Sequence, residues 1–437
     1  MCVGPPRFRR GSPHSLPHSK VKIMRRIDVV VIGGGQAGLA MSRSLSTEGI
    51  GHVVLERGRI GERWHSERWR SLHLLTTKAM SALPGLPHEG DPDSFMPASA
   101  FASYLSSYAG KIAAPVFGGV EVTRVEPIAQ GYRISTTVGE WQSRAVVIAT
   151  GACETPFRPA TANLLESSIE QISPTRYREP GQLSSGGVLV VGASSTGVQL
   201  AEEIHASGRP VVLSVGEHTR VPRRYRGRDI YAWMEAAGML DEAPVEGGNV
   251  EYARRQPSLQ VVGRPDNRDI HLGILRNQGV RLVGRFAGIS GGNAAFNGDL
   301  DKTTAAAHKR MVRCLDRIDA HIVGHGLQTT AADPAARVPF LAEGEATTLD
   351  LRREGIRSVV WATGYIRRYP WLKAPVLDQR GEIIHRGGVT SLPGLFVLGL
   401  TFLRRRRSSF IDGCGLDAHD LAPLVKIHLD FSTREVA

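Results

Sequence analysis

Three glycines that follow an apolar segment have the spacing of a phosphate-binding turn. Gly33, Gly35 and Gly38 come directly after the β-branched run IDVVVI, and apolar residues then recur at helical intervals. In such a unit the first glycine permits a tight turn, the second lets a pyrophosphate approach the backbone, and the third lets helix and strand pack closely. Glu56 ends the next strand, 23 residues after Gly33, where a carboxylate accepts hydrogen bonds from a ribose hydroxyl. The pattern predicts a dinucleotide site with its phosphates at the helix N-terminus.

A second copy of this pattern begins 159 residues later. Gly192, Ser194 and Gly197 follow the strand-like run VLVV and precede another amphipathic stretch. Ser194 stands where the middle glycine usually is, so a phosphate must tolerate its hydroxymethyl group or accept a hydrogen bond from it. The spacing is too long for a solenoid repeat and indicates a second dinucleotide-binding domain.

The residues after the next strand of this copy favour a 2′-phosphate. Val215 stands where an acid would bind a ribose hydroxyl, and three arginines follow: Arg220, Arg223 and Arg224. Arginine without a carboxylate suits the 2′-phosphate of NADPH rather than the free hydroxyl of NADH. The alternatives are that these arginines lie in a solvated loop or pair with Glu217 and Asp229, or that this domain has lost its nucleotide.

Two dinucleotide sites in one chain are explained economically by a resident FAD at the first and NADPH at the second. Hydride would then pass from the nicotinamide to the flavin, with the protein placing the two rings. Two buried-type strands that end in Ala-Thr-Gly, over residues 145–152 and 358–365, each lie downstream of one fingerprint.

The composition excludes several other classes of protein. Of the 437 residues 41% are hydrophobic and 22% charged, as in ordinary globular proteins. The four cysteines are far apart without a CxxC, which excludes a local dithiol centre or zinc ribbon and fits a reducing, cytoplasmic location. Despite a net charge of +12, no nucleic-acid-binding motif is present, and no apolar run reaches the ~18 residues of a membrane span. No metal-ligand spacing occurs either, so no metal site is expected.

The order of these motifs resembles that of the class B flavin-dependent monooxygenases, which include the flavin-containing monooxygenases, the plant YUCCA type and bacterial CzcO-like proteins. The resemblance covers about residues 25–435 and rests on GGGQAG (33–38), GERW (61–64), SLHLLTTKAM (71–80), ATG (149–151), GASSTG (192–197), WATGY (361–365) and VLGL (397–400). It implies an α/β fold with two Rossmann-like domains, the NADP domain inserted into the FAD domain. It also implies that NADPH reduces FAD, that O2 is captured as a C4a-(hydro)peroxyflavin, and that a small organic substrate receives one oxygen atom.

The fingerprints and the resemblance together divide the chain. We expect a disordered basic tail over 1–23, the first part of the FAD domain over 24–160, the NADP domain over 161–330 and the return of the FAD domain over 331–437. The sequence does not decide whether the chain forms a homodimer.

The candidate site residues follow from the same motifs. The candidate catalytic residues, near the flavin or in the interdomain cleft, are Trp64, Thr76, Lys78 and Tyr365; for each the alternative is a packing or loop role. The candidate cofactor-binding residues are Gly33, Gly35, Gln36, Ala37, Gly38, Glu56, Arg57, Arg63, Trp64, Ala149, Thr150, Gly151, Gly192, Ser194, Ser195, Thr196, Gly197, Arg220, Arg223, Arg224, Thr363 and Gly364.

Two positions depart from the family pattern. Ser173 replaces the histidine of the family's identifying motif, and Leu75 stands where the flavin-containing monooxygenases have an asparagine linked to the peroxyflavin. A non-oxygenating NADPH dehydrogenase or reductase, or a nucleotide-sensing flavoprotein without turnover, therefore remains an alternative to a monooxygenase. The run Arg404–Arg407 is expected to be a solvated loop, with a lid that attracts an anionic substrate as the alternative.

Overall fold

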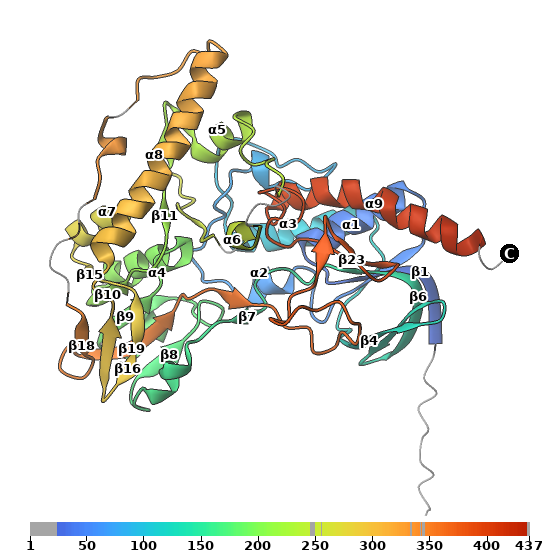
Figure 1. Ribbon diagram of the computed structural model, residues 1–437, viewed down its shortest axis with the longest axis horizontal. Coiled ribbons are helices and arrows are strands. Elements are labelled where there is room, and N and C mark those ends of the chain that lie inside the picture. The colour runs from blue at the N-terminus through green and yellow to red at the C-terminus, as the bar shows by residue number, and fades with distance from the viewer. Residues whose placement is uncertain are drawn as a thin grey trace, which may run out of the picture.

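The chain folds into two α/β units, as shown by a computed structural model (Figure 1). It describes residues 24–244, 250–254, 256–332, 334–340, 342 and 346–434. The predicted tail over 1–23 lies outside these residues. None of the helices in the described part of the chain combines the length and apolarity that a bilayer crossing needs.

The first unit is built on a nine-stranded sheet with the order β21-β22-β23-β6-β1-β2-β3, to which β4 and β5 are attached through β6. Its strands are β1 (Met24–Ile32), β2 (His52–Leu55), β3 (Val116–Phe117), β4 (Val122–Ile128), β5 (Gly131–Thr136), β6 (Gly139–Ile148), β21 (His385–Arg386), β22 (Val389–Thr390) and β23 (Leu395–Val397). The strands from β23 to β3 run parallel. The apolar run at the end of β1 and all of β2 are buried, as expected for parallel strands covered on both faces.

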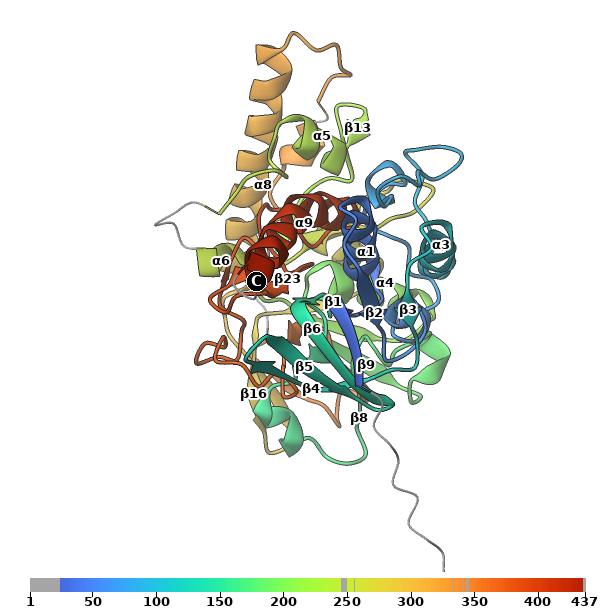
Figure 2. The same ribbon diagram turned by 90° about the vertical axis from the view of Figure 1, so that its right-hand side faces the viewer.

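Three helices cover one face of this sheet, and the β4–β5 hairpin lies on the other side (Figure 2). They are α1 (Gln36–Thr47), α3 (Ala98–Lys111) and α9 (Ile411–Arg434). Leu39, Leu45, Phe101 and Leu421 are fully buried among them. The short elements α2 (Glu62–Ser66) and η1 (Ala79–Ser81) lie between α1 and α3 in the chain.

The second unit has a five-stranded parallel sheet with the order β15-β10-β9-β19-β8. Its strands are β8 (Glu170–Ile172), β9 (Gly187–Val191), β10 (Val211–Ser214), β15 (Arg281–Val283) and β19 (Ile356–Trp361), and its helices include α4 (Ser195–Ala206) and α7 (Leu272–Gln278). The chain enters this sheet after β6 and returns to the first sheet at β21. The predicted fold class, two Rossmann-like domains with the second inserted into the first, is therefore confirmed.

The predicted end of the second domain at residue 330 is wrong. β19 pairs in parallel with both β8 and β9, so the second unit continues to Trp361. The segment between the units is an antiparallel pair, β7 (Thr155–Pro156) with β20 (Tyr365–Ile366), where the chain leaves and re-enters the first unit. The spacing of the motifs does not show where the second unit ends, because many residues separate β19 in the chain from β9, the strand with which it pairs.

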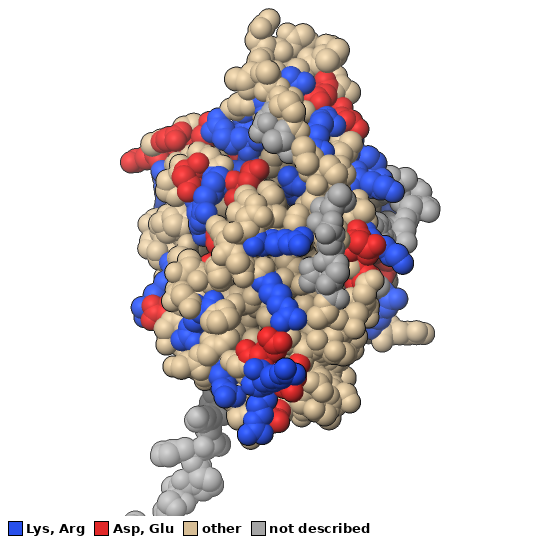
Figure 3. Space-filling view, turned by 90° about the vertical axis from the view of Figure 1, so that its left-hand side faces the viewer, with Lys and Arg blue, Asp and Glu red and all other residues tan. Residues whose placement is uncertain are grey.

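The remaining elements lie within or beside the second unit. A three-stranded antiparallel sheet contains β16 (Phe286–Ser290), β17 (Asn293–Phe296) and β18 (Thr348–Asp350), and short pairs join β11 (Thr219–Arg220) to β14 (Leu259–Gln260) and β12 (Arg224–Tyr225) to β13 (Arg228–Asp229). The helices are α5 (Ile230–Ala236), α6 (Val250–Arg254), α8 (Leu300–Gly324), η2 (Ala160–Leu164), η3 (Pro180–Gln182) and η4 (Pro334–Arg337). On the face seen in Figure 3, Lys and Arg are interspersed with Asp and Glu rather than gathered into one patch.

Candidate functional site

The first glycine turn leaves open space where a pyrophosphate would approach. Gly33 has φ +109°, and a Cβ there would lie 2.6 Å from the carbonyl oxygen of Ala149. A Cβ on Gly38 would lie 1.8 Å from the carbonyl oxygen of Gly33, so both positions require glycine for packing. Gly35, at φ −85° and ψ −170°, would place a Cβ with no atom within 4 Å. The middle glycine thus faces a cradle at the start of α1, as binding of a dinucleotide requires.

The second turn repeats this backbone geometry with serine at the middle position. Gly192 has φ +108° and would place a Cβ 2.3 Å from the carbonyl oxygen of Ala362, and Gly197 would place one 1.8 Å from the carbonyl oxygen of Gly192. Ser194 has φ −75° and ψ −174°, within 10° of Gly35 in both angles (−85 to −75, −170 to −174). Ser194 therefore fits without backbone strain, and its side chain lines the space in front of α4.

The two Ala-Thr-Gly segments have the same position in the two units. Ala149 follows β6 and lies against Gly33, and Ala362 follows β19 and lies against Gly192. In each sheet this strand is the neighbour of the fingerprint strand. Each segment therefore forms the second wall of a nucleotide-sized site, which explains the repeated motif.

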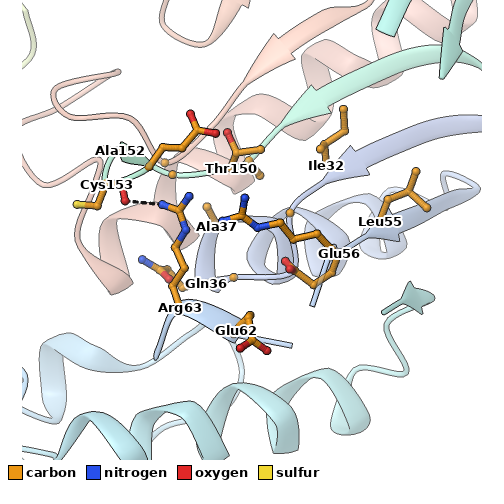
Figure 4. A pocket seen from close by; sticks show the side chains of 18 of the residues that line it. Ile32, Gln36, Ala37, Leu55, Glu56, Glu62, Arg63, Thr150, Ala152 and Cys153 are labelled. Atoms are coloured by element: carbon orange, nitrogen blue, oxygen red, sulfur yellow. Dashed lines mark hydrogen bonds between the residues drawn. The ribbon is translucent and has the colours of Figure 1, made fainter. Parts of the chain in front are cut away.

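A cavity of about 440 Å³ opens at the first turn and is called the first cavity here. All the predicted residues of this region line it except Gly38, which packs behind it. The lining residues are Gly33, Gly35, Gln36, Ala37, Glu56, Arg57, Arg63, Trp64, Ala149, Thr150 and Gly151. In Figure 4, Gln36 and Ala37 lie at the start of α1, and the segment from Thr150 to Cys153 forms the facing wall. The sequence reasoning missed Val120, Glu121, Val122, Pro370 and Trp371, which line the same cavity but carry no motif.

Glu56 is held rigidly at the edge of the first cavity. Its carboxylate oxygens accept hydrogen bonds from the backbone N–H of Gly34 (2.6 Å) and of Gly58 (2.9 Å), and the residue is 8% exposed. A carboxylate has about four acceptor positions, so two remain for a ligand. This suits the bidentate binding of ribose hydroxyls.

Arg63 and Trp64 are fixed by bonds across the first cavity. The Arg63 guanidinium donates to the carbonyl oxygen of Cys153 at 2.6 Å, the bond drawn in Figure 4. The Trp64 indole N–H donates to the Gln36 side chain at 3.2 Å, and its ring meets Phe101 edge-on with centroids 4.8 Å apart. Trp64 therefore packs against the first-unit core and also lines the cavity.

A larger cavity of about 1490 Å³ lies between the units and is called the interdomain cleft. Of the predicted residues, those that line it are Gly192, Ser194, Thr196, Thr363, Gly364 and Tyr365; Ser195 and Gly197 lie behind the turn. Four residues line both the cleft and the first cavity: Ala152, Cys153, Thr401 and Ser409. The two cavities therefore adjoin.

The cleft is strongly basic, but not through the predicted arginines. Eight arginines and three glutamates of the described chain line it, and the arginines are Arg254, Arg285, Arg310, Arg313, Arg317, Arg367, Arg380 and Arg406. Arg285 lies two residues after the end of β15, and its Nε would lie 3.5 Å from a Cβ on Gly216, just beyond the end of β10. The end of this strand is where a Rossmann domain recognises the ribose or its 2′-phosphate.

The structure does not bring Arg220, Arg223 or Arg224 to the cleft. The Arg223 guanidinium is buried, forms an ion pair with Asp229 and donates to the carbonyl oxygen of Leu75 at 2.9 Å. Arg220 donates to the carbonyl oxygen of Val338 at 3.2 Å, and Arg224 to that of Gly227. For Arg223, the alternative that the sequence left open, an ion pair with Asp229, is therefore the one that the structure shows.

Two of the four candidate catalytic residues are placed at the cavities. Tyr365 lines the cleft, and burial raises its pKa to about 12, so the phenol stays protonated at neutral pH. Thr76 and Lys78 are not among the described residues that line either cavity: the Thr76 hydroxyl bonds to that of Ser81 at 2.8 Å, and the Lys78 ammonium donates to the carbonyl oxygen of Glu89 at 3.2 Å.

The run Arg404–Arg407 is not a solvated loop, because each of its four arginines pairs with an acid. Arg407, 7% exposed, forms ion pairs with Glu235 (2.6 Å) and Asp412 (3.0 Å), and its Nε donates to Asp241 at 2.9 Å. Because Glu235 and Asp241 belong to the second unit, Arg407 joins the two units. A run of like charges indicates solvent exposure only when the fold supplies no acids around it.

Comparisons with known proteins agree with this geometry. Residues 30–235 match the family described as pyridine nucleotide-disulphide oxidoreductase. The chain is 30% identical over 398 residues to the uncharacterized oxidoreductase CzcO-like of Geobacillus kaustophilus, covering 90% of this chain and 97% of that protein. It is 23% identical over 392 residues to indole-3-pyruvate monooxygenase YUCCA1 of Oryza sativa, covering 85% and 86%. A variant of a flavin monooxygenase from Stenotrophomonas maltophilia shares the fold, with a TM-score of 0.66, 20% identity and coverage of 93% and 99%.

Proposed function

Because the chain belongs to the CzcO-like family of oxidoreductases, we propose that it is an NADPH- and FAD-dependent monooxygenase of a small organic molecule. FAD binds in the first cavity and NADPH in the interdomain cleft. The observation that supports this most directly is that the cavities adjoin at Ala152, Cys153, Thr401 and Ser409. Two coenzymes in these cavities meet at this shared wall.

The first cavity fits FAD in its donor set and in its open space. The cradle at Gly35 accepts a pyrophosphate at the N-terminus of α1, and Glu56 accepts the ribose hydroxyls. Arg63 lies near the shared wall, where its positive charge favours anionic groups of the ligand. When bound, FAD supplies the acceptance of two electrons from NADPH and the reaction with O2.

In the cleft, the residues after β9 and β15 hold NADPH. Ser194 and Thr196 line the start of α4, where backbone N–H groups and the helix dipole bind the pyrophosphate. Arg285 binds the 2′-phosphate beside Gly216. Tyr365 lies on β20, one of the two strands that connect the units. Because burial raises its pKa, its phenol stays neutral and is available as a hydrogen-bond donor.

The overall reaction balances without a further reductant. NADPH and one proton supply two electrons; one oxygen atom of O2 enters the substrate, and the other leaves as water. The protein's contribution is to hold both coenzymes against one wall and to limit the access of water.

The test begins with the purified protein. We expect a yellow protein with one FAD per chain, which NADPH bleaches under anaerobic conditions. With a substrate present, O2 consumption should match NADPH oxidation with little H2O2 released. A colourless protein that binds no added FAD would contradict the proposal at its first step.

A variant tests the coenzyme assignment. Arg285→Gln should raise the KM for NADPH by about tenfold or more and leave that for NADH unchanged, because only NADPH presents a 2′-phosphate. Arg176→Gln, which removes an exposed arginine outside both cavities, is the control of equal charge.

A second candidate function is an NADPH oxidase or reductase without oxygen transfer. Leu75, at the position where the resemblance implies a hydrogen-bonding asparagine, packs against the apolar cluster of Tyr231, Met234 and Phe410. Its side chain donates no hydrogen bond, so it cannot replace the asparagine. Release of all consumed O2 as H2O2, with every substrate tried, would favour this candidate.

A further inference from the structure

Arg254 is a cation in the interdomain cleft that pairs with no carboxylate of the described residues. It is the last residue of α6, which lies between the two units in Figure 1. Within the described residues its guanidinium forms no ion pair, and its Nη2 lies 3.3 Å from Nε2 of His385. Its Nε is buried and donates no hydrogen bond to any residue of the described ranges.

The acids near Arg254 are already paired with other arginines. Glu251, one turn earlier on α6, accepts from Arg380 at 2.6 Å, and Glu382 accepts from Arg367 at 2.6 Å. His385 is neutral because burial, together with repulsion by Arg254 and Arg367, lowers its pKa to about 4. No negative charge of the described chain therefore compensates Arg254 at contact distance.

Leaving a guanidinium partly buried and unpaired is unfavourable. Burial lowers the pKa of Arg254, which shows that its charged form has lost hydration. A buried charge normally has a partner or binds one. An anionic ligand in the cleft would supply that partner.

The walls of the cleft restrict what else this ligand contains. Apolar side chains from both units line the same space: Met234, Met239, Leu240, Ile383, Phe402 and Phe410. A molecule that fits here carries an apolar body as well as an anionic end. A free inorganic anion would leave these walls in contact with water.

We propose that the cleft binds a small organic carboxylate with an apolar body, whose carboxylate pairs with the Arg254 guanidinium. This rests on the proposed function, since it places the substrate in the cleft where FAD and NADPH meet. A planar carboxylate matches the fork geometry of arginine and can accept hydrogen bonds from the Nη donors, since the Nε is buried.

The coenzyme is the other source of an anion in this cleft. Its phosphates have their own positions at the second fingerprint, where Ser194 and Thr196 line the start of α4 and Arg285 and Arg310 flank the end of β10. Arg254, in contrast, contacts His385 of the first unit. The test therefore measures organic acids and NADPH separately.

The experiment uses the flavin-loaded protein with saturating NADP⁺. Binding of phenylacetate, 4-phenylbutyrate and octanoate is measured by calorimetry and compared with binding of the corresponding amides, which have the same shape without the charge. At least one acid should bind about tenfold or more tightly than its amide. Arg254→Gln should abolish this preference and leave the affinity for the amide unchanged, and Arg176→Gln should retain it.

Three results would overturn the proposal. In the first, no acid of the panel binds more tightly than its amide. In the second, Arg254→Gln retains the preference for the acid. In the third, Arg254→Gln raises the KM for NADPH by about tenfold, which would assign Arg254 to a coenzyme phosphate. Because calorimetry needs no turnover, binding of an acid without substrate oxygenation would contradict the proposed function alone.

Discussion

Adding one methyl group at Gly35 should separate coenzyme binding from folding. Gly35 has φ −85° and ψ −170°, which alanine adopts readily, and an added Cβ meets no atom within 4 Å. Ser194 shows that the fold accepts a larger side chain at the equivalent position of the second turn, with nearly the same backbone angles. Gly35→Ala should therefore leave the protein without FAD within about 1 kcal/mol of the parent's stability, because the lost freedom of the unfolded chain offsets the poorer N-cap that alanine gives α1.

The same methyl group should weaken FAD binding. It occupies the space in which the pyrophosphate approaches the start of α1, so binding requires the ligand or the turn to move. Overpacking of this kind costs about 1–3 kcal/mol, which corresponds to a roughly 5- to 150-fold higher Kd.

Gly38→Ala is the matched comparison, because it adds the same group three residues later. Its Cβ would lie 1.8 Å from the carbonyl oxygen of Gly33, and contacts under 3.0 Å do not occur, so the helix must move by at least 1.2 Å (3.0 − 1.8). This clash is between α1 and the turn before it, so it destabilises the folded protein whether or not FAD is bound. We expect the protein without FAD to lose about 3 kcal/mol or more of stability.

Two measurements decide between these effects. Urea unfolding of the deflavinated proteins, followed by circular dichroism, gives the stability without coenzyme. Titration with FAD, followed by quenching of flavin fluorescence, gives the Kd. The reasoning is refuted if Gly35→Ala lowers the stability as much as Gly38→Ala does, or if it binds FAD with the parent's affinity.

Three further predictions concern the ion pairs, a histidine and the cysteines. Arg407→Met should lower the free energy of unfolding by about 3 kcal/mol in urea titrations, the low end for a broken buried pair because Glu235 is partly exposed; an unchanged value would mean that Arg407 does not join the units energetically. Burial lowers the pKa of His271 from 6.5 to about 4, so below pH 6.5 the unfolded chain takes up a proton that the folded chain does not, and stability falls as the pH drops toward 4. His271→Asn keeps an acceptor for the N–H of Gly273 and should flatten this dependence by up to about 1.4 kcal/mol per pH unit between pH 6.5 and 4, whereas an equal slope in both proteins would contradict the assignment. Iodoacetamide at pH 8 should modify Cys153 before Cys314, whose pKa burial raises to about 11, and NADP⁺ should slow the modification; peptide mass spectrometry measures the order, and faster labelling of Cys314 would count against it.

The sequence by itself determined the parts of the site that depend on local geometry. A strand, a tight turn and a helix within about fifteen residues leave few arrangements for the glycines. For this reason Gly33, Gly35 and Gly38 could be assigned roles, and Glu56 could be placed at the end of the neighbouring strand. The second copy followed in the same way, including the serine at position 194.

The tertiary structure alone decided which charged residues face the ligands. Arg223 stands close to the second fingerprint in the chain, but its guanidinium is buried against Asp229. Arg285 and Arg254 line the cleft although no motif contains them, because β15 and α6 come from distant parts of the chain. An arginine side chain is long and pairs with whichever acid the fold brings near, so its direction cannot be inferred from its neighbours in sequence. The end of the second domain at β19 and the adjoining wall of the two cavities are likewise products of long-range strand pairing, which no local pattern records.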